Sequence, residues 1–147
     1  MKKLTSIEGI LDFAIGAETK AHELYLKMAA MAKNPWVSKT IEGMAQEELQ
    51  HKRKLKAVRA GRIALEREDV GDLGIADTLD DVEPHAEMDY RELVRFAVKK
   101  EAASQKLYSR LASVFSEPEL RETFLRLAAE EADHKRRFEM QHDWLTS

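Results

Sequence analysis

Two short stretches of the chain are near copies of one another: EELQHKR at 47–53 and EEADHKR at 130–136. Each contains a glutamate three positions before a histidine, and side chains with that spacing share one face of an α-helix. The four residues are Glu48, His51, Glu131 and His134. All four fall on what the surrounding pattern predicts to be the apolar stripe of a helix. Buried ionisable groups need hydrogen-bond partners, opposite charges or a metal ion, so a prediction of the fold must also supply partners for these four residues.

The apolar pattern around both stretches is helical. Apolar residues recur at alternating steps of four and three, the spacing of a helix that buries one face in a bundle. The stripes run over residues 7–32, 37–58, 90–115 and 120–145. No segment has the pattern of a β-strand. The sequence therefore predicts an all-α protein of four long helices.

Local signals mark the ends of these helices. TSIE at 5–8 and DYRE at 89–92 resemble capping boxes, in which a side chain at the helix start accepts a backbone hydrogen bond. Pro35 and Pro118 lie where the first and third helices are expected to have ended. The predicted helices thus form two pairs, each joined by a short loop.

The second pair repeats the first. Residues 13–56 align with 96–139 without a gap, and 14 of the 44 aligned positions are identical. A duplicated helical hairpin explains these identities, which fall on the stripes and on the loop proline. We expect one domain over 1–147, with antiparallel hairpins at 5–60 and 88–145 and a crossover linker at 61–87.

The long linker predicts the overall topology. It allows the second and third helices to lie parallel, the crossover arrangement of ferritin-like four-helix bundles. Alternatively, it could carry the second hairpin to another subunit, and the sequence leaves that swap open.

Composition narrows the function classes. The net charge of −3 argues against nucleic acid as a partner, because a phosphate-binding surface needs an excess of basic residues. No run approaches the roughly 20 apolar residues of a membrane span, and the start lacks the features of a signal peptide, so we expect a cytoplasmic protein without a membrane partner. The chain contains no cysteine, which excludes disulfides, thiol catalysis and sulfur-ligated metals within it.

The repeat supplies partners for the two Glu-x-x-His motifs. In each half a further glutamate lies mid-stripe on the preceding helix, at the same interval before the motif: Glu18 before Glu48, and Glu101 before Glu131. Antiparallel pairing would bring each glutamate level with the motif on the next helix. Four buried carboxylates are very unfavourable without cations, and their four charges match two divalent ions. Carboxylate and imidazole ligands suit iron, with manganese or zinc as substitutes.

Other matches to the motif are weaker. Glu139 and His142 have the same spacing, but no glutamate lies at the matching upstream position, so we interpret them as non-functional. His22 and His85 are predicted to be surface residues, with His22 the better candidate for a role because it lies one turn beyond Glu18.

The motifs, their tyrosines and the long crossover resemble the ferritin-like domain of the rubrerythrin family, over nearly the whole chain. The resemblance implies that Glu48 and Glu131 bridge two irons, that Glu18 and Glu101 are terminal ligands, and that His51 and His134 each bind one iron. It also implies that Tyr25 and Tyr108 donate hydrogen bonds to the carboxylates. Plain core packing of these tyrosines is the alternative.

Two differences from the family limit how far its site and reaction can be assigned to this chain. Rubrerythrin proper carries a C-terminal rubredoxin-like domain with four cysteines, which this chain lacks, so we expect electrons from an external donor such as a rubredoxin-like protein. The family also has an extra glutamate one turn after the third-helix ligand. Ser104 occupies that position, and Ala21 the equivalent one in the first half, so neither half supplies a seventh carboxylate.

Three functions follow as hypotheses. The first is a di-iron oxidoreductase that reduces hydrogen peroxide or oxygen, protects against oxidative stress and assembles as a homodimer. The second is a ferritin-like ferroxidase for iron storage or detoxification, which would need a large hollow assembly. The third is a metal-free bundle that serves as an interaction module.

Overall fold

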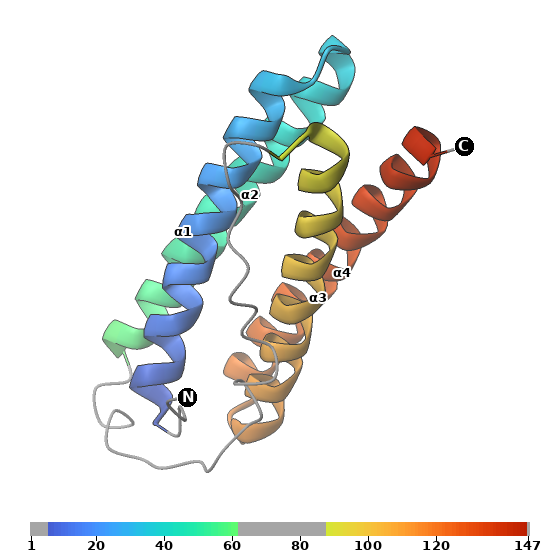
Figure 1. Cartoon of the computed structure of the whole chain (residues 1–147). Coiled ribbons are helices and arrows are strands. Elements are labelled where there is room, and N and C mark those ends of the chain that lie inside the picture. The colour runs from blue at the N-terminus through green and yellow to red at the C-terminus, as the bar shows by residue number, and fades with distance from the viewer. Residues whose placement is uncertain (1–5, 62–87, 147) are drawn as a thin grey trace. The chain divides into compact units, whose positions relative to one another are not determined.

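A computed structural model describes residues 6–61 and 88–146, and every regular element in these two ranges is a helix. The four helices, shown in Figure 1, are α1 (Ile7–Met31), α2 (Pro35–Gly61), α3 (Tyr90–Val114) and α4 (Pro118–Thr146). The predicted all-α class is confirmed. Of the predicted crossover linker, residue 61 is the last residue of α2, and residues 62–87 lie outside the described residues.

The chain divides into two compact units, Met1–Ala76 and Asp77–Ser147. Within the first unit α1 packs against α2, and within the second α3 packs against α4. A short turn joins the helices of each pair, at 32–34 and at 115–117, so each pair is an antiparallel hairpin (Figure 1). The predicted architecture of two helical hairpins is confirmed. None of the four helices has an apolar stretch long enough to cross a bilayer.

The helix ends follow the predicted chemistry with one shift. α3 begins with the expected capping box: Asp89 Oδ1 accepts from the Glu92 amide at 2.8 Å, and Glu92 Oε1 accepts from the Asp89 amide at 3.3 Å. At α1 the cap is Ser6, one residue later than predicted, and its hydroxyl accepts from the Gly9 amide at 3.0 Å. The box TSIE at 5–8 predicts Thr5 as the cap, but a serine caps equally well where its oxygen reaches an amide of the first turn, as Ser6 does.

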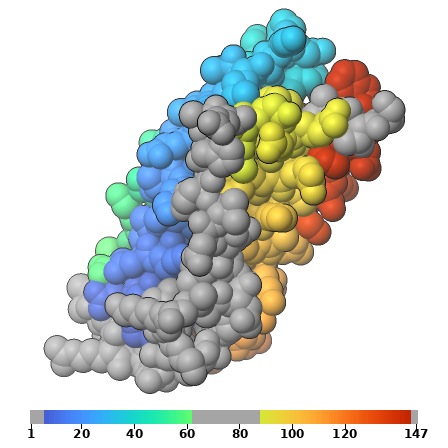
Figure 2. Space-filling model, viewed as in Figure 1, coloured from blue at the N-terminus to red at the C-terminus, as the bar shows by residue number. Residues whose placement is uncertain are grey.

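Both prolines begin a helix. Pro35 is the first residue of α2 and Pro118 the first of α4, where the missing N–H has no intrahelical acceptor to lose. The turn that precedes Pro35 is closed by Asn34, whose Oδ1 accepts from the Trp36 amide at 2.8 Å. This turn lies at the surface (Figure 2), and Trp36 is 75% exposed.

Each hairpin buries the stripe that the sequence predicts. Three pairs of side chains that the repeat relates are at most 1% exposed in both hairpins: Tyr25 and Tyr108, Met28 and Leu111, and Ile41 and Phe124. In the second hairpin Phe124 stacks on Phe115, with ring centroids 5.3 Å apart and planes 7° from parallel. The first hairpin has Ile41 and Ala32 at these positions, so the two hairpins fill their cores with different side chains at the same register.

The open ends of the hairpins are closed differently. In the first unit, Arg59 on α2 forms ion pairs with Glu8 and Asp12 on α1. In the second unit, the Tyr90 hydroxyl on α3 donates a hydrogen bond to Gln141 Oε1 on α4. Burial raises the pKa of Tyr90 to about 12.

The raised pKa of Tyr90 predicts a loss of stability at high pH. The folded protein favours the neutral hydroxyl, which contributes to the free energy of unfolding. This contribution is complete below pH 10, the pKa of tyrosine in the unfolded chain, and is lost as pH rises toward 12. We expect wild-type protein to lose more stability between pH 9 and pH 12 than Tyr90→Phe, measured by urea unfolding at each pH. The two proteins would lose the same amount if Tyr90 titrated normally.

Candidate metal centre

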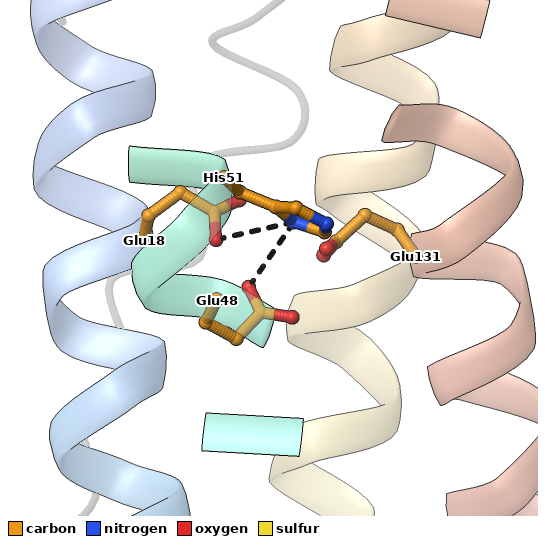
Figure 3. A group of neighbouring side chains, drawn as sticks. All are labelled: Glu18, Glu48, His51 and Glu131. Carbon is orange, nitrogen blue, oxygen red and sulfur yellow. Dashed lines mark ion pairs between the residues drawn. The ribbon is translucent and has the colours of Figure 1, made fainter. Parts of the chain in front are cut away.

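Three ionisable side chains meet in the middle of the first hairpin. Glu18 comes from α1, and Glu48 and His51 come from one turn of α2 (Figure 3). The Nδ1 atom of His51 lies 3.6 Å from Glu18 Oε2 and 4.0 Å from Glu48 Oε2. One ligand atom from each of the three residues lies within 4.8 Å of the others. All three side chains are buried, with at most 1% of each residue exposed.

The second hairpin contains the same triad. Glu101 comes from α3, and Glu131 and His134 come from one turn of α4. The Nδ1 atom of His134 lies 3.7 Å from Glu101 Oε1, against 3.6 Å for the corresponding pair in the first hairpin. One ligand atom from each of the three residues again lies within 4.8 Å of the others, and all three are buried. The duplication seen in the sequence therefore extends to the geometry of the triads.

Helix lengths explain why the interval between Glu18 and Glu48 works. Glu18 lies as far before Met31, the last residue of α1, as Glu48 lies after Pro35, the first residue of α2. Because the rise per residue is the same in both helices, the two glutamates are equally far from the turn and lie level with each other. The same equality holds in the second hairpin for Glu101 on α3 and Glu131 on α4.

The chemistry of each triad fits a divalent metal. Each triad places two glutamates and one histidine in a buried position, and a buried ionised group loses several kcal/mol of solvation in order of magnitude. A divalent cation would neutralise the charges and accept oxygen and nitrogen donors together. Carboxylate oxygen with imidazole nitrogen suits iron, manganese and zinc. Each triad is therefore a candidate metal site.

The two predicted tyrosines lie next to the triads along the chain. Tyr25 is two turns after Glu18 and is fully buried; Tyr108 stands in the same relation to Glu101 and is 1% exposed. The ring of Tyr108 packs near Phe124, with centroids 6.2 Å apart. Hydrogen bonding from these hydroxyls to the glutamates stays a prediction.

The third Glu-x-x-His match and the other two histidines lie outside the triads. In the third match, Glu139 with His142, the glutamate is exposed and forms an ion pair with Lys135 on its own helix at 4.0 Å. His85 lies outside the described residues. The sequence predicts a surface position for His22, but this residue is half-buried, and its ring donates across the hairpin to the Ala45 carbonyl at 3.0 Å. No sequence pattern indicates this bond, because its acceptor is a backbone atom.

Comparison with known proteins identifies the family. The rubrerythrin family model matches residues 9–72 and 92–145, which is most of the chain and includes all six residues of the two triads. The chain belongs to the rubrerythrin family. This confirms the resemblance drawn from the motifs, and together with the buried triads it suggests a di-iron site.

A solved structure supports the fold independently. A hypothetical protein from Pyrococcus furiosus matches with a TM-score of 0.76, covering 96% of this chain and 90% of that chain at 24% identity. Together with the family assignment, this likeness agrees with the predicted ferritin-like four-helix fold class. No curated protein matches the sequence.

Proposed function

We propose that this rubrerythrin-family protein is a di-iron oxidoreductase that reduces hydrogen peroxide with electrons from an external donor. The observation that carries the proposal is the pair of buried triads, each with two glutamates and a histidine, repeated in both halves of the sequence. Membership of the family supports iron among the metals that such donors accept.

The proposal joins the two triads in one centre. Glu48 and Glu131 would each be shared between the two ions. Glu18 and Glu101 would each be a terminal ligand of one ion, and His51 and His134 would each bind one ion. The charge count supports this assignment, because four carboxylates balance two divalent cations. A centre of this kind makes 1–147 a single functional domain, although each hairpin is compact by itself.

Two iron(II) ions, when bound, supply two electrons. Reduction of one peroxide then balances as H₂O₂ plus two electrons and two protons giving two waters, with the O–O bond broken. The electron donor returns both electrons; a rubredoxin-like protein is the donor that the family resemblance implies.

The chain's own residues would contribute binding and orientation. The apolar side chains around each triad exclude bulk water, which strengthens the electrostatic interactions inside. Tyr25 and Tyr108 would donate hydrogen bonds to glutamate oxygens and so fix the carboxylate orientations. Each proposed histidine ligand stands one turn from a glutamate on the same rigid helix, which limits how far the pair can separate.

The test is anaerobic loading with two iron(II) per chain, followed by rapid mixing with either peroxide or air-saturated buffer. We expect oxidation by peroxide to be at least about tenfold faster, with one peroxide consumed per two irons. Matched rates, or a preference for oxygen with iron accumulating beyond two per chain, would support a ferroxidase instead. Light scattering on the same sample separates the two, since storage needs a large shell and the proposal expects a dimer.

The cellular part of the proposal is a cytoplasmic peroxide scavenger that protects against oxidative stress. Deletion of the gene should raise sensitivity to added peroxide, and expression of wild-type protein should reverse this. Expression of Glu48→Gln should not reverse it, because the variant lacks a proposed bridging ligand. Equal rescue by both proteins would contradict the proposed reaction.

A further inference from the structure

His22 links the two helices that carry the first triad. It lies one turn after Glu18 on α1, and its Nδ1 lies 3.0 Å from the carbonyl oxygen of Ala45, which is one turn before Glu48 on α2. A carbonyl oxygen only accepts, so Nδ1 carries the proton and donates this bond. His22 therefore ties α1 to α2 within one turn of two residues of the triad.

The second hairpin lacks this link. In the repeat alignment, Gln105 stands at the position of His22 and Ala128 at the position of Ala45. The acceptor carbonyl is thus available in both hairpins, but in the part of the chain that the structure describes Gln105 makes no hydrogen bond to it. The second hairpin therefore repeats the triad of the first hairpin but not the cross-helix hydrogen bond beside it.

We propose that His22 is a positioning residue that makes the two metal sites unequal, so that the site of Glu18, Glu48 and His51 fills first. This inference rests on the proposed di-metal function. A bond that fixes the separation of α1 and α2 lowers the cost of bringing Glu18 to the ligands of α2 when the metal binds. The second hairpin lacks this contribution, because within the described residues Gln105 on α3 makes no hydrogen bond to the Ala128 carbonyl on α4.

The expected size of the effect follows from one hydrogen bond. A net contribution of the usual size for one bond corresponds to about three- to tenfold in a binding constant. This is smaller than the loss of a ligand and large enough to separate two steps in a titration.

The chain provides a matched control. Ser38 on α2 donates to the carbonyl oxygen of Ala29 on α1 at 2.7 Å, which is the same kind of bond between the same two helices. Ser38 lies nearly three turns before Glu48, so about 15 Å of helix separates it from the triad. Ser38→Ala should therefore remove a cross-helix bond without changing metal affinity.

The test is an anaerobic titration of the whole chain with cobalt(II) followed by absorbance, repeated with iron(II) by calorimetry. We expect two steps in wild type. Glu18→Gln should remove the tighter step and Glu101→Gln the weaker one. His22→Ala should weaken the tighter step three- to tenfold and leave the weaker step within twofold. His22→Asn, which keeps a donor near the position of Nδ1, should restore most of the affinity.

Each other outcome has a definite meaning. A single step in wild type, equal weakening of both steps by His22→Ala, or the same effect from Ser38→Ala overturns the positioning role. Two bound ions with rapid peroxide oxidation, but no response to His22→Ala, overturns this inference alone. Failure of wild type to bind two ions overturns the proposed function as well.

Discussion

Glu48→Gln should reduce the metal content of the purified protein from two ions per chain to at most one. Glutamine keeps the size of the side chain but removes the charge, and an amide oxygen is a much weaker ligand for a divalent cation than a carboxylate. Changes to residues that only support a ligand already lower metal affinity by about 10- to 100-fold, so loss of a proposed bridging ligand should exceed that range. Elemental analysis with calorimetry measures both quantities.

The repeat predicts the same result for Glu131→Gln, since Glu131 occupies the equivalent position in the second hairpin. Glu139→Gln is the control: it changes a glutamate with the same spacing to a histidine on the same helix, but Glu139 is exposed. It should bind two ions with wild-type affinity. If either buried variant retained two ions with unchanged affinity, the proposed ligand set would be wrong.

The sequence predicts the triads well because helical geometry ties their residues to simple spacings. Glu48 and His51 share a turn, and equal distances from the loop bring Glu18 level with them. These relations depend only on helix rise and on a short loop, so they need no knowledge of side-chain packing. The same argument predicts the hairpins, and the local pattern at Asp89 predicts its capping box.

The rest of the site depends on contacts that have no periodic signal. The bond from His22 ends on a backbone carbonyl, which every residue possesses, so no residue type at position 45 could have indicated it. The cap at Ser6 was missed by one residue because Thr5 and Ser6 are chemically similar caps. Whether Tyr25 and Tyr108 point their hydroxyls at carboxylates depends on rotamers, which spacing alone does not fix.

The same charges that would bind metal should destabilise the metal-free protein. Glu18, Glu48, Glu101 and Glu131 are each at most 1% exposed, so their solvation is lost on folding whether or not an ion is present. Each buried ion loses several kcal/mol of solvation in order of magnitude, and neighbouring carboxylates repel one another, so exchanging one of the four for a neutral amide of similar size should relieve part of this cost. The glutamates are therefore expected to lower the stability of the metal-free protein and to raise that of the metal-bound protein.

This conflict predicts that the effect of Glu48→Gln on stability reverses sign with metal. In the metal-free protein we expect the variant to unfold about 2–12 °C above wild type, since relief of about 1–3 kcal/mol shifts the unfolding temperature of a domain of this size by about 2–4 °C per kcal/mol. In saturating iron(II), wild type should be the more stable, because an ion at about 1,000 times its dissociation constant adds about 4 kcal/mol that the variant largely lacks.

Anaerobic thermal scans with chelator and with iron(II) measure both arms of this prediction. Glu139→Gln is again the control and should match wild type within about 1 °C in each, because an exposed glutamate carries little desolvation cost. A metal-free Glu48→Gln less stable than metal-free wild type would mean that the buried glutamate is stabilised by its protein neighbours alone. The charge argument for two cations would then fail, since the carboxylates would need no metal to be accommodated in the core.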